Sequence, residues 1–113
     1  MERVTILDTC VAIGRKEGLI TAITAIEYPT AVRFDFDILW PDNEDLQKAI
    51  ELAASLYAIG KPVPASDLII ASMAIRRELD LLTMDKHFGY IKEVAPELSL
   101  TVISKPKSEL ARV

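Results

Sequence analysis

Residues 65–74 read Ala65-Ser66-Asp67-Leu68-Ile69-Ile70-Ala71-Ser72-Met73-Ala74, and the apolar run Leu81-Leu82-Thr83 follows shortly after them. The apolar residues of the first run go nearly all the way round a helix, which is typical of a helix with no exposed face. We therefore predict a helix from Ser66 or Asp67 to about Leu79, buried in the middle of the domain. The second run predicts a short strand.

Helices and strands alternate on both sides of this pair, which predicts an α/β fold. The expected fold is a three-layer sandwich around a central, mostly parallel sheet of about four or five strands, with right-handed crossovers. We expect a single domain over residues 1–103 and a poorly packed C-terminal tail over 104–113. The other predicted strands are Val4–Leu7, Ile20–Thr24, Phe34–Ile38 and Leu100–Ile103, and the other helices are Thr9 to about Lys16, about Ala25 to Arg33, Asp42 to about Gly60, and Lys86–Ile91.

The charge of the chain limits the classes of partner. Its 113 residues carry a formal net charge of −4, and the sequence pI is about 5.0. Non-specific binding to duplex nucleic acid is not expected, since such binding needs a broad basic face. A nuclease remains compatible, because carboxylates grouped at a metal site lower the net charge while a few basic residues contact phosphate. A domain of this size buries a core with little margin, so we also expect a homodimer.

The sequence predicts a soluble, cytoplasmic protein without a membrane partner. Cys10 is the only cysteine, so no internal disulfide can form, which fits a reducing compartment. We expect this thiol to pack rather than to react. The N-terminus lacks the hydrophobic region of a signal peptide, and no window approaches the roughly 18 to 20 apolar residues of a membrane span.

Four carboxylates occupy positions that a parallel sheet would bring together. Asp8 and Asp85 follow predicted strands, Glu27 follows the run Ile20–Thr24, and Asp67 opens the central helix. The carboxyl ends of parallel strands lie at one edge of a sheet, so we expect the four side chains to meet there. Grouped carboxylates repel one another unless a cation holds them, and an oxygen-only ligand set suits Mg²⁺ or Mn²⁺.

Each acid also has a simpler explanation as a helix cap. Asp8, Asp67 and Asp85 each stand where a helix or turn begins, which is a favoured use of aspartate. Glu27 fits a capping box with Thr24. Capping does not require all four acids to follow strand ends, so their joint occurrence favours a metal site.

Other polar residues suggest less chemistry. His87 is the only histidine, which excludes a two-histidine zinc site; it is expected in an exposed turn, with a role at the rim of the site left open. The acidic residues between positions 35 and 45 are expected to form a solvated face with helix capping. Thr9 and Thr83 neighbour the proposed ligands and could orient them, although ordinary packing explains them equally well.

The sequence resembles the PIN-domain ribonucleases, many of whose small members are VapC-type toxins of toxin–antitoxin pairs. The resemblance covers nearly the whole chain, from Val4 to Ile103, and residues 66–74 with 82–88 are its most specific part. The motifs that carry it are Leu7-Asp8-Thr9, Ala25-Ile26-Glu27, Ala65 to Ala74, and Leu82-Thr83-Met84-Asp85-Lys86-His87-Phe88.

Three features depart from the family pattern. Asp8 and Glu27 are only 19 positions apart, so the first helical segment is shortened. Pro29 follows Glu27 closely and can kink the helix that aims this carboxylate. His87 stands where family members often carry another aspartate. These departures put efficient catalysis in question more than the fold.

The resemblance implies a metal-dependent endoribonuclease with an RNA substrate and an antitoxin that covers the acidic groove. Asp8, Glu27, Asp67 and Asp85 would be its catalytic residues. Asp8, Asp67 and Asp85 would hold Mg²⁺ or Mn²⁺, and Glu27 would ligate the metal or orient water. Such a metal lowers the pKa of a water and stabilises the departing oxygen. Candidate phosphate contacts are Arg15, Lys16, Arg33 and Lys86.

Two alternatives remain open at this point. The first is a PIN-like scaffold that has lost efficient chemistry and serves as a protein-interaction subunit, which the shortened front half and Pro29 favour. The second, a phosphoacceptor receiver domain, is weaker, because that design needs adjacent acids after the first strand and Asp8 stands alone.

Overall fold

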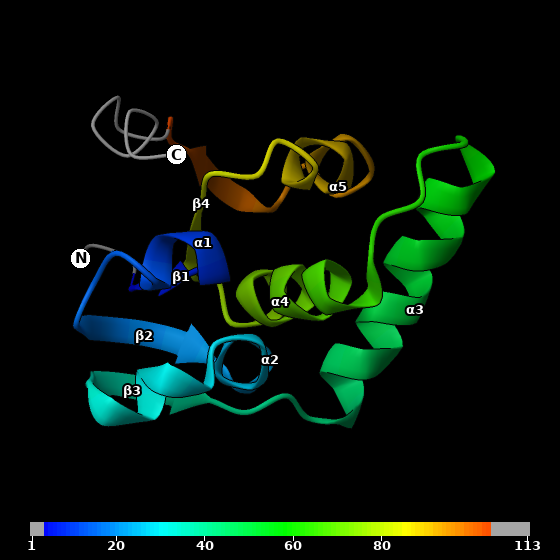
Figure 1. The fold of residues 1–113 in the computed structure, drawn as a ribbon. Helices are drawn as coiled ribbons and strands as arrows, with labels where there is room; N and C mark the ends of the chain where they lie inside the picture. The colour runs from blue at the N-terminus through cyan, green and yellow to red at the C-terminus, as the bar shows by residue number, and fades with distance from the viewer. Residues whose placement is uncertain (1–3, 105–113) are drawn as a thin grey trace.

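The computed structural model of the chain describes residues 4–104. Helices and strands alternate along these residues, as predicted (Figure 1). The elements are β1 (Thr5–Leu7), α1 (Thr9–Ala12), β2 (Glu17–Thr21), α2 (Ala22–Glu27), the 3-10 helix η1 (Pro29–Arg33), β3 (Asp35–Leu39), α3 (Asn43–Ala58), α4 (Ala65–Arg76), β4 (Asp80–Thr83), α5 (Phe88–Val94) and β5 (Ser99–Val102).

The strands form one five-stranded sheet in the order β3-β2-β1-β4-β5, and every neighbouring pair is parallel. The predicted α/β class with a parallel sheet is therefore confirmed. The chain builds outward from β1 through β2 to β3 and then returns to add β4 and β5 on the other side of β1. The strand order thus reverses between β1 and β4, which is where ligand sites form in sheets of this kind.

Helices cover both faces of the sheet. Successive strand residues point to opposite faces, so neighbouring residues of one strand lie in different cores. Ile6 and Leu81 lie in one core, packed with residues of α3, α4 and α5. Leu7 and the partly buried Leu82 lie in the other, against α1 and η1. Figure 1 shows that α4 runs through the middle of the molecule and that α3 lies at its edge, on the outer side of α4. The central helix is buried as residues 65–74 predicted.

Asp45 corrects the prediction of a solvated acidic face. Asp42 caps α3 as expected, since its side chain accepts from the Asp45 amide at 2.9 Å. Asp45 itself is fully buried and accepts hydrogen bonds from Arg77 at 2.7 Å and from Arg76 at 2.6 Å. Burial alone would raise the pKa of Asp45, but the hydrogen bonds from Arg77, the Asp42 backbone and Arg76 lower it to about 2. The packing of α4 against α3 creates these contacts.

The second strand begins earlier than predicted, because Gly18 belongs to it. The sequence predicted a first helix from Thr9 to about Lys16, but α1 already ends at Ala12 and β2 starts at Glu17. Gly18 has a φ of 138°, and a Cβ at this position would lie 2.7 Å from the Leu7 side chain. Glycine is needed here for a left-handed conformation and a close approach between neighbouring strands.

The second helix is displaced with the strand. α2 begins at Ala22, three residues before the predicted start, and Thr21 caps it by accepting from the Thr24 amide at 3.3 Å. Pro29 ends it, because a residue before proline is forced out of the helical region. Tyr28 accordingly has φ −133° and ψ 73°, and η1 follows. Glu27 therefore lies in the last turn of α2 and not in the first.

Within residues 4–104, no helix combines the length and the apolarity needed to cross a bilayer. The predicted tail over 104–113 lies almost wholly outside the described residues.

Candidate active site

The two central strands place Asp8 and Asp85 at the point where the strand order reverses. Asp8 directly follows β1, and Asp85 comes two residues after the end of β4. These strands are neighbours, with Leu7 opposite Leu82, and the Asp8 amide continues the ladder by donating to the Leu82 carbonyl at 2.9 Å. The carboxyl ends of the strands therefore bring the two acids to the same edge of the sheet, as predicted.

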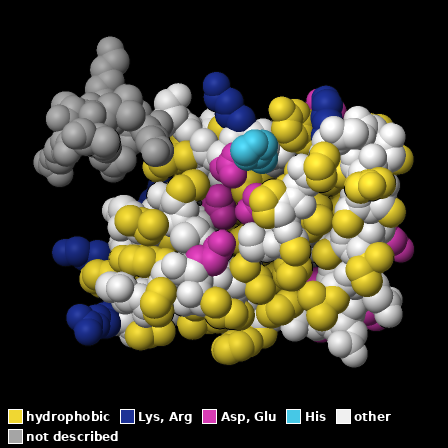
Figure 2. All heavy atoms as spheres, turned by 45° about the vertical axis from the view of Figure 1, so that its right-hand side comes forward, with side chains coloured by type: hydrophobic (Ala, Val, Ile, Leu, Met, Phe, Trp, Pro, Cys, Tyr) yellow, Lys and Arg dark blue, Asp and Glu magenta, His cyan; other side chains and the backbone are white. Residues whose placement is uncertain are grey.

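All four predicted carboxylates line one open groove of about 290 Å³. Figure 2 shows acidic side chains gathered in a hollow in the middle of one face, with the histidine at its upper end. The residues that line the groove are Asp8, Thr9, Cys10, Ile13, Glu27, Asp67 and Asp85.

Asp8 is buried at the floor of the groove and is held from β4. It is only 6% exposed, and Thr83 Oγ1 donates to Asp8 Oδ2 at 2.7 Å. Thr83 is fully buried and also accepts from the Asp85 amide at 2.9 Å. Asp8 occupies the N-cap position of α1 but makes no side-chain capping bond. The capping explanation is therefore wrong for Asp8, and Thr83 orients a carboxylate as the sequence suggested.

Glu27 reaches the groove from the end of α2. Thr9 Oγ1 donates to Glu27 Oε1 at 2.8 Å and lies 3.1 Å from Thr24 Oγ1. The capping box expected between Thr24 and Glu27 is wrong, because Thr21 caps this helix. Pro29 ends α2 directly beyond Glu27, yet the carboxylate still lines the groove.

Asp67 lies in the first turn of α4, where the helix dipole favours a negative charge. Its pKa is nevertheless raised to about 6, first by burial and then by repulsion from Asp8, Asp85 and Glu27, although His87 opposes the shift. The other three acids therefore lie close enough to act on Asp67. None of the hydrogen bonds among residues 4–104 reaches its carboxyl group.

Asp85 combines a capping role with a place in the groove. Asp85 Oδ1 accepts a hydrogen bond from the His87 amide at 2.9 Å and lies 2.8 Å from His87 Nδ1. The turn before α5 is thus held by this carboxylate, as the capping explanation required. The imidazole is exposed at the rim, where the sequence had left a role open.

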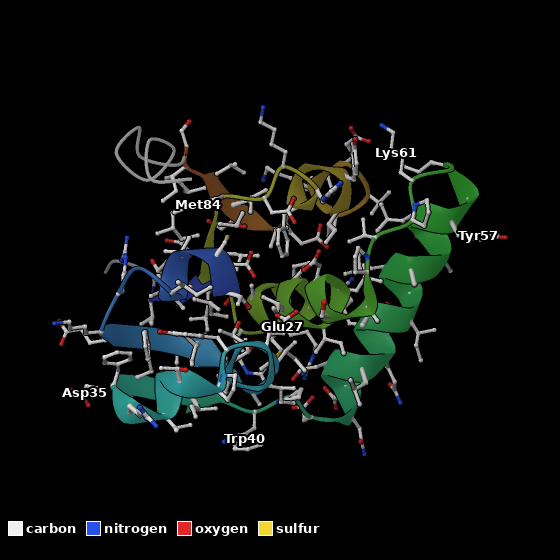
Figure 3. The ribbon with its side chains drawn as sticks, in the orientation of Figure 1. Glu27, Asp35, Trp40, Tyr57, Lys61 and Met84 are labelled. Atoms are coloured by element: carbon white, nitrogen blue, oxygen red, sulfur yellow. The ribbon has the colours of Figure 1, made fainter. Side chains whose placement is uncertain are left out.

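Three of the four predicted phosphate contacts lie away from the carboxylates. Arg15 and Lys16 precede β2, and Arg33 precedes β3, so all three lie at the amino ends of these strands. Figure 3 shows this separation through the labelled Asp35, which begins β3, and Glu27. Only Lys86 is adjacent to a residue of the groove. A linear sequence does not reveal which end of a strand a loop residue occupies until the strand bounds are right.

The sequence did not predict a place for Cys10 in the groove. Its Sγ donates to Asp8 Oδ2 at 3.4 Å and accepts from the Met84 amide at 3.3 Å. Burial raises the pKa of this thiol, while the hydrogen bond from the Met84 amide and the contact with Thr83 Oγ1 oppose the rise. The expectation that the thiol packs rather than reacts agrees with this environment. The only sequence signal was its position two residues after Asp8.

The donor chemistry of the groove fits a hard divalent cation. Asp8 Oδ2 and Glu27 Oε1 each accept a hydrogen bond from a threonine hydroxyl, and Asp85 Oδ1 accepts from the His87 amide. The Asp67 carboxyl is repelled by these three acids. Among residues 4–104, no three His, Cys, Asp or Glu side chains are arranged to hold a metal ion as they stand. A cation would thus have to draw the carboxylates together, which their mutual repulsion opposes without one.

Comparison with known proteins establishes the fold. No protein-family model and no curated protein matches the chain. Solved structures do match. One is VapBC2 from Rickettsia felis, solved with a DNA fragment from the VapBC2 promoter. Its TM-score is 0.69 at 19% identity, and the match covers 87% of this chain and 97% of that one. DNA-bound VapBC from Salmonella typhimurium has a TM-score of 0.67 at 20% identity, over 89% and 98% of the two chains.

A third match extends the same pattern. VapBC-5 from Mycobacterium tuberculosis, a member of the VapBC family of toxin–antitoxin systems, has a TM-score of 0.63 at 19% identity and covers 92% of this chain and all of that one. The chain therefore shares the α/β fold of these VapBC structures.

Proposed function

We propose that the chain is a divalent-cation-dependent endoribonuclease that hydrolyses RNA phosphodiester bonds. The observation that carries this proposal is the meeting of four carboxylates, from four separate segments of the chain, around one groove at the reversal point of the sheet. The VapC-like fold supports a nuclease of this class.

Asp8, Asp67 and Asp85 would hold Mg²⁺ or Mn²⁺. When bound, the cation supplies positive charge that lowers the pKa of a water and offsets the charge that develops on the leaving oxygen. Glu27, fixed by Thr9, would ligate or orient the attacking water from the α2 side of the groove. Thr83 keeps the Asp8 carboxylate in place from β4.

The matched VapBC structures support a role as the toxin of a toxin–antitoxin pair, with an antitoxin as the protein partner. The antitoxin would cover the acidic groove and keep RNA out. A homodimer remains part of the proposal, since a domain of this size gains stability from burying further apolar surface.

A second candidate function, that of a PIN-like interaction scaffold, is favoured by a separate apolar groove. This groove, of about 330 Å³, lies between α3 and α4 and is lined almost only by apolar atoms. Ile50, on its wall, is 70% exposed. Such a surface suits a protein partner whether or not the acidic groove is active.

One experiment separates these candidates. The purified protein, its Asp8→Asn variant and a matched Asp35→Asn control are incubated with mixed RNA in Mg²⁺ or Mn²⁺. Asp35 is an exposed aspartate at the opposite end of the sheet (Figure 3). We expect cleavage by the wild type and the control, and a loss of roughly 100-fold or more in Asp8→Asn, because a metal ligand contributes several kcal/mol to the transition state. Absence of cleavage by the wild type, or equal cleavage by Asp8→Asn, contradicts the enzyme and leaves the scaffold.

A further inference from the structure

An exposed row of aromatic and basic side chains continues the acidic groove over α5. The His87 side chain is 62% exposed, and its Nδ1 lies 2.8 Å from Asp85 Oδ1. Its ring centroid lies 5.9 Å from that of Tyr90, at an interplanar angle of 53°. Lys61 Nζ lies 4.9 Å from the centroid of the Tyr90 ring. The row begins at the Asp85 carboxylate of the groove and ends at the Lys61 ammonium group.

Among the described residues, this rim also carries positive charge next to a residue of the groove. Lys86 is exposed beside His87, and Lys61 extends from the loop between α3 and α4 toward α5. Figure 2 shows the histidine at the upper end of the acidic hollow, with a Lys or Arg side chain above it. A polyanion that enters the groove from the α5 side would therefore meet favourable potential there.

We propose that His87, Tyr90, Lys61 and Lys86 form an RNA-binding subsite that stacks a nucleobase beside the scissile phosphate and contacts the adjoining phosphates. This inference rests on the proposed ribonuclease function and assigns where the substrate lies. Bases of single-stranded RNA stack on aromatic and imidazole rings, and lysines contact the phosphates between them.

The contacts make His87 a preorganised platform. Its amide donates a hydrogen bond to Asp85 Oδ1, its Nδ1 lies 2.8 Å from the same oxygen, and Tyr90 contacts the ring from α5. A ring that is already fixed loses little conformational entropy when a base stacks on it. Lys61 is shared with Glu93, whose carboxylate lies 3.1 Å from Nζ. Glu93 therefore weakens the attraction of this rim for phosphate.

A different role for His87 has to be separated from stacking, because the imidazole could serve only to orient Asp85. His87→Trp keeps an aromatic face and loses the contact between Nδ1 and Asp85 Oδ1. His87→Asn keeps a short side-chain donor and loses the aromatic face. Stacking predicts that His87→Trp binds RNA like the wild type and His87→Asn does not, whereas an orienting role alone predicts that neither change alters RNA affinity.

The test is fluorescence anisotropy with a labelled, single-stranded oligoadenylate. The full chain carries Asp8→Asn so that the RNA stays intact, and circular dichroism verifies that every variant is folded. We expect His87→Asn and Tyr90→Ala each to weaken binding by about 5-fold to 150-fold, the range expected for one stacked base. Tyr57→Ala is the matched control, since this tyrosine of α3 is 80% exposed and points away from the groove (Figure 3).

The lysines are tested through the salt dependence of the same affinity. Lys61→Ala and Lys86→Ala should each reduce the slope of log affinity against log salt by about 0.7, the value for one phosphate contact on a single strand. Lys48→Ala, on α3, should leave the slope unchanged. Glu93→Gln should tighten binding, because it removes the carboxylate that competes for Lys61.

The outcomes distinguish this inference from the proposed function. RNA cleavage by the wild type together with unchanged RNA affinity in His87→Asn and Tyr90→Ala overturns the subsite and leaves the ribonuclease intact. RNA binding that depends on His87 and Tyr90 without any cleavage supports the subsite and contradicts the ribonuclease. No measurable binding of oligoadenylate at low salt overturns the subsite.

Discussion

Thr83 Oγ1 donates a hydrogen bond of 2.7 Å to Asp8 Oδ2, which ties the ends of the two central strands together at the floor of the acidic groove. The same hydroxyl oxygen accepts from the Asp85 amide at 2.9 Å. One buried threonine thus fixes both a carboxylate and the backbone that carries a second one. Asp8 is thus held from β4 by Thr83 and, through a longer contact, from α1 by Cys10.

Thr83→Val should remove both hydrogen bonds with little change in volume. We expect the free energy of unfolding to fall by about 1–3 kcal/mol, because a buried carboxylate and a buried amide each lose a partner. RNA cleavage should fall by about 10-fold to 100-fold through kcat. Thr83→Ser should restore both quantities in chemical denaturation and in cleavage assays. Equal losses in the Ser variant point to methyl packing instead of the hydroxyl.

Asp67→Asn should stabilise the metal-free protein near neutral pH. The pKa of Asp67 is raised to about 6 in the folded protein, from an ordinary value of 3.8. In the wild type, the stability that comes from a protonated Asp67 is therefore complete below about pH 4. It is lost as the pH rises through 6, where the carboxyl ionises in the folded protein. Two pKa units correspond to about 3 kcal/mol, and the half-buried side chain is screened by solvent, which leaves a gain of about 1–2 kcal/mol for Asp67→Asn.

Urea unfolding with EDTA, at pH 7.5 and at pH 4, measures this difference. The gain should be present at pH 7.5 and absent at pH 4, where Asp67 is protonated in the wild type. A gain of the same size at both pH values would show that charge repulsion is not its cause.

Divalent cations should stabilise the wild type, because they relieve the repulsion in the groove. At a Mn²⁺ concentration 100-fold above the dissociation constant, the expected gain is about 2.7 kcal/mol. The gain should shrink at pH 5, where Asp67 is largely protonated, and in Asp8→Asn. Thermal unfolding with and without Mn²⁺ measures it, and an equal increase in Asp8→Asn places the cation elsewhere on the molecule.

Asp45→Ala should destabilise the fold without acting on the groove. Its removal leaves Arg76 and Arg77 without their buried partner, and the expected cost is about 3 kcal/mol. Because the pKa of Asp45 is lowered to about 2, its stabilisation is present above about pH 4 and is lost as the pH falls toward 2. Asp37→Ala, on an exposed part of β3, is the control, and chemical denaturation across this pH range measures both variants.

The positions of Asp8 and Asp85 were predictable because each follows a short apolar run, and the ends of such runs mark the carboxyl edge of a parallel sheet. Glu27 was assigned to the right site from an incorrect helix position. The error came from starting the second strand at Ile20, because the structure includes Gly18 in this strand, where it approaches Leu7 closely.

Contacts between distant segments were not predictable from local pattern. Asp45 was expected to be solvated, since nothing near it in sequence indicates that Arg76 and Arg77 will pack against it. Cys10 lines the groove because β1 and β4 are neighbours, and a lone cysteine carries no signal of that pairing. Both depend on the order of elements in space.

The most direct test of a single metal-dependent site is the rate of RNA cleavage as a function of Mn²⁺ concentration, measured for the wild type, for Asp8→Asn, Glu27→Gln, Asp67→Asn and Asp85→Asn, and for Asp35→Asn. We predict that Asp35→Asn follows the wild type, that Asp8→Asn, Asp67→Asn and Asp85→Asn lose activity and need more Mn²⁺, and that Glu27→Gln loses rate. Cleavage that needs no divalent cation, or that survives the loss of these carboxylates, would contradict the account.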